Sequence, residues 1–247
     1  MTLAETGIGI YRRHGATPDH LQVFGERSSG TNFVNRLLAK NTTLTPTDAY
    51  GWKHGFAQMT GIGQRALIVG VLREPLGWVR SMYAKPWHCP PDMQALTFSD
   101  FLRAEWGTIV DRKRYFPRAG ELGTVGTPLQ QDRHPVTGQP FANIADLRAM
   151  KAAYLLGLRN RGCNLVLCRL GDVQTDPEGF VVKVSEAFDL PPVEAYRPVT
   201  KRLGSKFLAN VEDRPSPPET VSDADRSYLA STLNPKVEAA WGFPLPA

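Results

Sequence analysis

The sequence lacks an apolar run of the length needed to cross a bilayer, so we expect no membrane span. It also lacks a continuous apolar segment after Arg12 and Arg13, which argues against a secretory signal and favours a cytoplasmic location. Cysteine is scarce: Cys89, Cys163 and Cys168 form no CxxC pair and lie beside no plausible set of metal ligands. We therefore expect free thiols and no metal site.

Acidic residues are outnumbered by basic ones, 24 to 29, which leaves a formal charge of +5. Such an excess suits an anionic partner, which can be a nucleic acid, an acidic surface or a phosphorylated small molecule. The excess alone does not choose between these partners. The basic residues form no tail, and their local cluster at 112–114 has no aromatic-rich recognition motif around it. We therefore expect a solvated loop face there and no nucleic-acid partner.

Strand patterns alternate with helical patterns along the chain. In chain order the sequence predicts a strand at 21–25, a helix at 31–40, a strand at 66–74, a helix at 75–84, a helix at 143–162, a strand at 164–170 and a helix that begins at Asp176 and Pro177. This alternation predicts an α/β fold with a mostly parallel central sheet and helices on both faces. In such folds ligands bind at the carboxyl ends of the strands.

The segment 107–142 is rich in glycine, proline and arginine and is too long for a plain connector inside a compact domain. Loops of this length are usually functional or mobile. At 247 residues, the chain is long enough to bury one substantial core. We therefore predict a single domain, 1–247, with a long loop insertion at about 107–142.

A turn with several hydroxyls joins the first predicted strand to its helix, and it consists of Ser28, Ser29, Gly30 and Thr31, followed by Asn32. The first N–H groups of a helix have no partner inside the helix, and the helix dipole is positive at this end. Glycine lets the backbone approach an anion closely, and hydroxyls donate further hydrogen bonds, so this turn can cradle a phosphate. The alternative is that Ser29 or Thr31 only caps the helix.

The turn differs from the Walker loop of ATP- and GTP-binding proteins, G-x-x-x-x-G-K-[ST]. Gly25 and Gly30 have the right separation, but Thr31 and Asn32 replace the lysine and the hydroxyl residue. The second strand ends in Arg73 where an acidic partner for magnesium would stand. A magnesium-dependent kinase or another P-loop-like phosphotransferase is therefore the weaker hypothesis.

A second anion site is predicted where the strand at 66–74 meets the next helix. Arg73 stands at the strand end, and Ser81 lies one to two turns into the helix. A planar guanidinium and a hydroxyl can together hold one phosphate. The alternative is a surface ion pair between Arg73 and Glu74 and an ordinary helix hydroxyl for Ser81.

The segment YGWKHGF, residues 50–56, supplies a candidate base. Histidine is the side chain most easily used as a base near neutral pH, and His54 lies between the two predicted ligand loops. Lys53 directly precedes it. Adjacent side chains alternate on a strand, so both reach one site only if Gly51 or Gly55 bends the backbone. The alternative is a histidine with a purely structural role.

Together these residues resemble the PAPS-dependent sulfotransferase family. The segment GERSSGTN, residues 25–32, is similar to that family's grip for the 5′-phosphosulfate, and Arg73 with Ser81 has the Arg-x7-Ser spacing of its 3′-phosphate grip. The segments 164–188 and 233–244 are also similar to later elements of the family. The resemblance implies a P-loop NTPase-like sulfotransferase architecture, with PAPS as co-substrate and no required metal.

The resemblance also implies roles for three side chains. His54 would take the proton from a hydroxyl or amine of a small-molecule or carbohydrate acceptor, and Lys53 with Arg27 would balance charge on the departing phosphate. Two features depart from the family pattern. Ser28 stands where a lysine or arginine usually precedes Ser-Gly-Thr, and Lys53 and His54 are adjacent where members often have Lys-x-His. A phosphotransferase and a non-catalytic anion or nucleic-acid binder are the alternatives.

Overall fold

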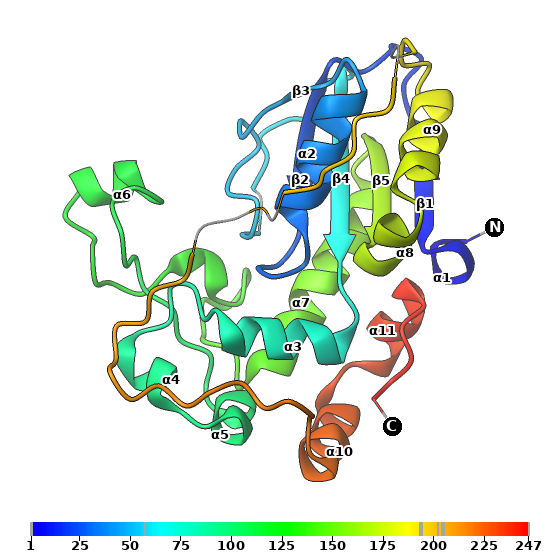
Figure 1. Ribbon diagram of the computed structural model, residues 1–247. Helices are drawn as coiled ribbons and strands as arrows, with labels where there is room; N and C mark the ends of the chain where they lie inside the picture. The colour runs from blue at the N-terminus through cyan, green and yellow to red at the C-terminus, as the bar shows by residue number, and fades with distance from the viewer. Residues whose placement is uncertain (1, 57, 193–194, 202, 204–205, 247) are drawn as a thin grey trace. The chain divides into compact units, whose positions relative to one another are not determined.

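The structure, a computed structural model, describes residues 2–56, 58–192, 195–201, 203 and 206–246 (Figure 1). The chain separates into two compact units. The first unit comprises Met1–Glu74, Lys151–Ser205 and Pro235–Pro244, and the second comprises Pro75–Met150, Lys206–Asn234 and Leu245–Ala247. The single domain covering 1–247 stays a prediction.

The first unit is built on a β-sheet. Its strands are β1 (Ile8–Tyr11), β2 (His20–Phe24), β3 (Thr45–Pro46), β4 (Ala66–Leu72) and β5 (Asn164–Arg169). In the part of the chain that the structure describes, the sheet has five strands in the order β1-β5-β4-β2-β3. Strands β3, β2, β4 and β5 run parallel, while β1 pairs with β5 antiparallel at one edge. The predicted α/β fold with a mostly parallel sheet is therefore confirmed.

Helices cover both faces of this sheet. The helices of the first unit are α1 (Leu3–Thr6), α2 (Thr31–Asn41), α8 (Leu170–Thr175), α9 (Pro177–Ala187), α11 (Pro235–Trp241) and the second half of α7 (Ile144–Gly157). Alternate residues of each strand enter opposite cores: Leu67 and Val69 of β4 pack with α2 and α9, while Ile68 and Leu72 pack with α7 and α11. Because β4 is buried on both faces, its sequence, ALIVGVL, is a continuous apolar run.

Most predicted elements of the first unit are present, with changes at their ends. Strand β4 ends two residues earlier than predicted, at Leu72. Helix α7 gives way to a 3-10 turn, η2 (Leu158–Asn160), and Gly162, with φ of 64°, leads into β5. Asp176 caps α9 as expected, since its Oδ1 accepts the N–H of Gly179 at 2.9 Å.

The second unit consists of short helices joined by long connections. They are α3 (Pro75–Ala84), α4 (Pro91–Ala95), α5 (Phe98–Arg103), α6 (Pro117–Glu121), the 3-10 turn η1 (Gln130–Asp132), the first half of α7 and α10 (Asp223–Thr232). The segment predicted as a loop at 107–142 thus contains α6 and η1. An isolated β-bridge between Trp106 and Phe141 holds its two ends together.

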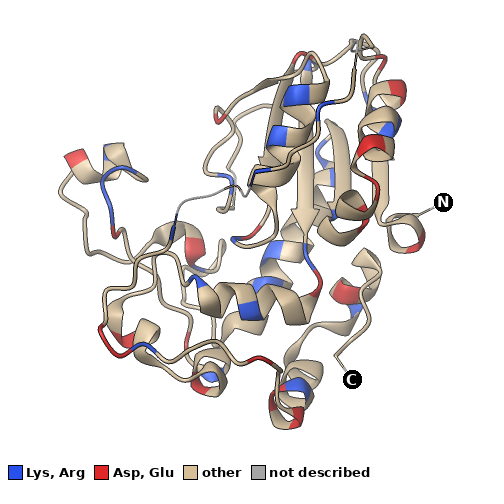
Figure 2. Ribbon diagram, in the orientation of Figure 1, with Lys and Arg blue, Asp and Glu red and all other residues tan. Residues whose placement is uncertain are grey.

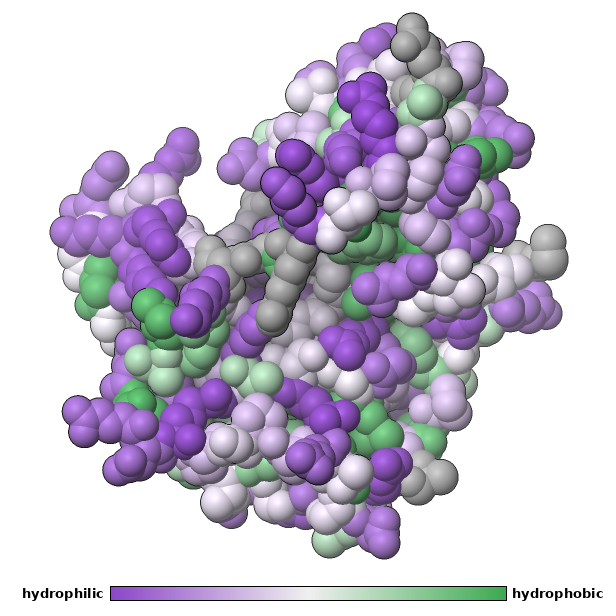
Figure 3. Space-filling view, viewed as in Figure 1, coloured by the Kyte–Doolittle hydropathy of each residue, from purple (hydrophilic) through white to green (hydrophobic). Residues whose placement is uncertain are grey.

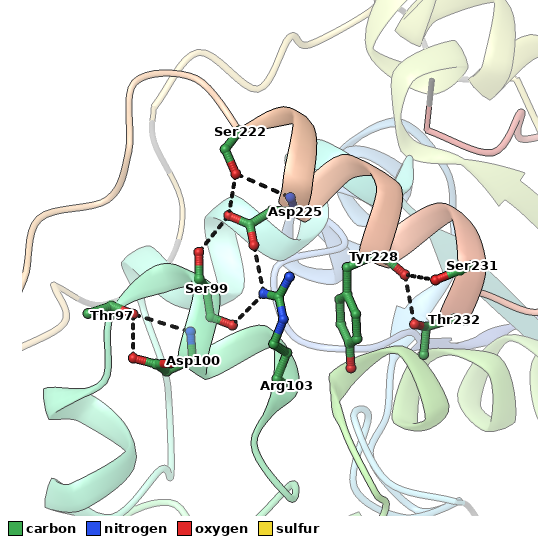
Figure 4. A network of polar contacts seen from close by, with 9 residues as sticks. All are labelled: Thr97, Ser99, Asp100, Arg103, Ser222, Asp225, Tyr228, Ser231 and Thr232. Atoms are coloured by element: carbon green, nitrogen blue, oxygen red, sulfur yellow. Dashed lines mark hydrogen bonds and ion pairs between the residues drawn. The ribbon is translucent and has the colours of Figure 1, made fainter.

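A buried carboxylate joins α5 to α10 within the second unit (Figure 4). Asp225 accepts hydrogen bonds from Oγ of Ser99 at 2.7 Å, Nη1 of Arg103 at 2.7 Å and Oγ of Ser222 at 2.8 Å. Burial alone would raise the pKa of Asp225, but these donors outweigh burial and lower the pKa below its ordinary value. Arg103 also lies over the ring of Tyr228. The network is a structural tie between two helices.

The face shown in Figure 3 is mostly hydrophilic, and hydrophobic residues appear there in small separate groups. Within the described ranges, no helix combines the length and the apolar character that crossing a membrane requires. The three cysteines are buried and carry free thiols.

Gly25, directly after β2, lies too close to β4 to accept a side chain. A Cβ atom there would be 2.4 Å from the backbone oxygen of Val71, whereas Gly61 has open space around it. We expect Gly25→Ala to lower the free energy of unfolding by about 1–3 kcal/mol, because the backbone of β4 must shift. The control Gly61→Ala should change it by less than about 1 kcal/mol. Urea unfolding measures both, and equal midpoints would contradict the expectation.

Candidate anion-binding site

Helix α2 begins without a side-chain cap and without an acidic residue in its first turn. Its N-cap residue is Gly30, which has no side chain to serve as a cap and adopts the left-handed conformation with φ of 87°. The first turn contains no acidic residue, and the basic residues Arg36 and Lys40 follow on the same helix (Figure 2). The N–H groups of the first turn and the positive end of the dipole thus offer a place for an anion.

The hydroxyl of Ser29 is buried at this helix end without a partner. Ser29 is 0% exposed, and its Oγ makes no hydrogen bond within the described chain. Leaving a buried hydroxyl unpaired costs about 1–3 kcal/mol. Ser28 has φ of 64°, so Ser29 lies between two left-handed residues. An unpaired polar group in a strained turn is typical of a loop shaped for a ligand. Ser29 therefore does not serve as the helix cap.

Two charged side chains are buried in the same β2–α2 loop (residues 25–30). Glu26 and Arg27 are 1% and 2% exposed. Oε1 of Glu26 accepts the backbone N–H of Arg27 at 2.7 Å and its Nε–H at 2.8 Å. The guanidinium carbon of Arg27 lies 5.8 Å from the ring centre of Trp52. We predicted that Arg27 balances charge on a departing phosphate. In the structure its guanidinium forms an ion pair with the carboxylate of Glu26.

The segment that carries Lys53 and His54 forms a turn, not a strand. Gly51 has φ of 109°, and the N–H of Gly55 donates to the backbone oxygen of Trp52 at 2.9 Å. The rule that adjacent side chains point to opposite faces applies to extended chain and does not hold in such a turn. The bend that we named as the condition for both side chains to reach one site is present.

Both side chains of this turn contact residues at the start of α2 or just before it. Nζ of Lys53 donates to Oδ1 of Asn32 at 2.5 Å. Nδ1 of His54 lies 2.7 Å from the backbone oxygen of Gly25. A backbone hydrogen bond at 3.0 Å, from the N–H of Gly25 to the oxygen of Lys53, fixes the turn against the loop. The structure thus brings Lys53, His54 and the predicted cradle together in the first unit.

His54 is suited to accept a proton at Nε2. A carbonyl oxygen can only accept, so the contact with Gly25 places the ring hydrogen on Nδ1 and leaves the lone pair on Nε2. The pKa of His54 is well below its ordinary value, first because burial disfavours the charged ring and next because Lys53 lies beside it. The ring is therefore neutral near pH 7.

Lys151 of α7 is a member of this group that the sequence analysis missed. It is 3% exposed, its Nζ donates to the backbone oxygen of His54 at 2.5 Å, and it lies 3.6 Å from Oε2 of Glu26. A signal was present, because a lysine at position 151 interrupts the apolar stripe that Leu147 and Leu155 form at helical spacing. A charge on the buried face of a helix needs a partner.

The proposed grip for a second phosphate is divided between the two units. Arg73 follows β4 in the first unit, where its Nε lies 3.3 Å from Oε1 of Glu74. Ser81 lies on α3 in the second unit. The ion pair with Glu74 is the contact named in the alternative interpretation, and the joint binding of a phosphate by Arg73 and Ser81 stays a prediction.

Comparison with known proteins found no relative of this chain. A scan against protein-family models found no match, and neither did searches of curated proteins and of solved structures. Among the described residues, no group of three or more His, Cys, Asp and Glu side chains is placed to hold a metal ion. The proposed function therefore rests on the contacts within the first unit.

The Ser29→Ala variant tests whether the hydroxyl of Ser29 is kept for a ligand or caps helix α2. Removing a cap costs about 0.5–2 kcal/mol, whereas removing a buried hydroxyl without a partner relieves its desolvation cost. We expect Ser29→Ala to leave the free energy of unfolding unchanged or to raise it by up to about 1 kcal/mol. Urea unfolding without ligand is the measurement. A loss of stability as large as that of a lost cap would show that Ser29 has a structural partner.

Proposed function

We propose that this protein transfers a sulfuryl group from PAPS to a hydroxyl or amine of a small-molecule or carbohydrate acceptor. The observation that carries the proposal is the buried Ser29 hydroxyl, unpaired in the described chain, at the start of α2. The lack of space for a Cβ at Gly25 holds the start of this loop closely against β4. Parallel strands followed by helices agree with a P-loop NTPase-like sulfotransferase architecture, which belongs to the same proposal.

PAPS, as co-substrate, supplies the sulfuryl group and leaves as PAP. In the proposal, the N–H groups of residues 29–32 and the hydroxyls of Ser29 and Thr31 bind its 5′-phosphosulfate. Arg73 and Ser81 bind the 3′-phosphate, as the resemblance implies. Lys53 and Arg27 balance the negative charge that develops on the leaving phosphate.

His54 serves as the general base in the proposed reaction. The acceptor oxygen or nitrogen forms a bond to sulfur, the bond from sulfur to the bridging oxygen of PAPS breaks, and the acceptor proton passes to Nε2 of His54. The low pKa of His54 keeps Nε2 free to receive this proton at neutral pH. The reaction needs no metal in principle, because fixed cations can balance a leaving group that carries the charge.

The proposal is tested by ligand-induced stabilisation. PAP without metal should stabilise the protein, by about 2.7 kcal/mol at a hundredfold excess over Kd. Arg73→Ala should weaken this effect strongly, while His54→Ala should leave it nearly intact. The measurement is a thermal shift with PAP, with ATP plus magnesium, and with a short oligonucleotide. Preference for ATP plus magnesium would indicate a phosphotransferase, and a response to the oligonucleotide alone that vanishes with salt would indicate a nucleic-acid binder.

The role of His54 predicts a pH profile. The active form of a general base is neutral, and the pKa of His54 in the folded protein is lowered. As the pH falls, kcat/KM should therefore hold through the ordinary histidine range around 6.5 and decline only at lower pH. His54→Ala should abolish turnover. Rates with labelled PAPS and a panel of acceptors provide the measurement, and full activity of His54→Ala would disprove the base assignment.

A further inference from the structure

Lys151 connects the two loops of the candidate site from a third segment of the chain. Its Nζ donates to the backbone oxygen of His54 at 2.5 Å and lies 3.6 Å from Oε2 of Glu26. Its Nζ also lies 4.3 Å from the ring centre of Phe56. Helix α7, which carries it, packs through Leu155 against the sheet. One ammonium group thus fixes the 51–56 turn and the β2–α2 loop to a rigid element.

The burial of this ammonium group needs an explanation beyond packing. A buried cation loses its hydration, and replacing it with an apolar side chain of similar volume is often neutral or stabilising for a fold. The ion pair with Glu26 at 3.6 Å is longer than a charge-assisted hydrogen bond. A shorter contact, at 2.5 Å, goes to the backbone oxygen of His54, the residue that we propose as the base. We therefore interpret this hydrogen bond as a contact that orients the backbone of His54.

We infer that Lys151 is a positioning residue, which holds the backbone of His54 against the β2–α2 loop so that Nε2 keeps its place beside the anion cradle. The inference rests on the proposed function for its kinetic consequence, although the contacts themselves do not depend on it. Lys151 is not a catalytic residue in this scheme, because its Nζ is engaged by the backbone of His54 and by Glu26.

Lys151 also acts on His54 through its charge. Three cations act on the ring through their charge: Lys53 on the same turn, Arg27 on the β2–α2 loop and Lys151 on α7. Glu26 belongs to the same cluster through its contacts with Arg27 and Lys151. Burial and Lys53 are the main causes of the lowered pKa of His54, and Arg27 and Lys151 add to them. Removing the charge of Lys151 must therefore raise this pKa, and removing the negative charge of Glu26 must lower it.

The test uses four variants. Lys151→Met removes the charge and the hydrogen bond while keeping a long apolar side chain, and Lys151→Arg keeps a cation. Glu26→Gln removes the charge of the partner. Lys183→Met, at an exposed position of α9 in the same unit, is the matched control. Circular dichroism establishes that each variant is folded.

With labelled PAPS and an acceptor, Lys151→Met should reduce kcat roughly tenfold to a hundredfold, as expected for a displaced base. KM for PAPS should rise by a smaller factor than kcat falls, because the N–H groups of residues 29–32, Arg27 and Lys53 remain when the charge of Lys151 is lost. The acidic limb of kcat/KM should move to higher pH in Lys151→Met and to lower pH in Glu26→Gln. Lys151→Arg should recover part of kcat, and Lys183→Met should match the wild type.

A second readout needs no substrate. The ring nitrogens of His54, followed by NMR with 15N-labelled histidine and assigned with His54→Ala, should titrate at higher pH in Lys151→Met and at lower pH in Glu26→Gln. Unchanged titration in folded Lys151→Met would overturn the inference. Should Lys151→Met not fold, the same titration of Glu26→Gln decides it, because no shift there would also overturn it. If wild-type protein neither binds PAP nor turns over, the proposed function fails, while the titration still decides the role of Lys151.

Discussion

The buried carboxylate of Glu26 is the interaction on which the site depends. It lies in the loop before α2, where the helix dipole already makes a negative charge favourable. Arg27 donates to it directly, and Lys151 approaches its other oxygen from α7. Around this one carboxylate the fold therefore gathers basic side chains from the β2–α2 loop and from α7. In the proposed function, these cations favour an anion at the start of α2.

This arrangement obtains positive charge differently from a Walker loop. In that loop a lysine directly after the glycine reaches the phosphates, whereas Thr31 stands at that position here. The cations come from separate segments: Arg27 from the loop, Lys53 from the 51–56 turn and Lys151 from α7. A charge assembled from three segments forms only when the unit is folded, so its strength depends on packing as much as on the motif.

The sequence predicted the elements whose local patterns are strong. Buried parallel strands such as β4 read as apolar runs, and Asp176 with Pro177 marks the start of α9. Strand β1 was missed because it is a short, partly buried edge strand, and β3 because it has only two residues. The motif around Ser29 marked the loop before α2, and the role of this loop as a phosphate cradle stays a prediction. The helical pattern shows that Lys151 interrupts an apolar stripe, but its partners lie 95 and more positions away along the chain, so no local pattern identifies them.

The low pKa of His54 would offset the effect of an anion bound beside it. A negative charge beside a histidine favours the charged ring and raises its pKa. A histidine that began at its ordinary value would then be protonated more readily near neutral pH when a phosphorylated donor bound, which would weaken it as a base. Burial, Lys53, Arg27 and Lys151 lower the pKa in the free protein. In the proposed function, the cations that attract the donor therefore also oppose protonation of Nε2 of His54 when the donor is bound.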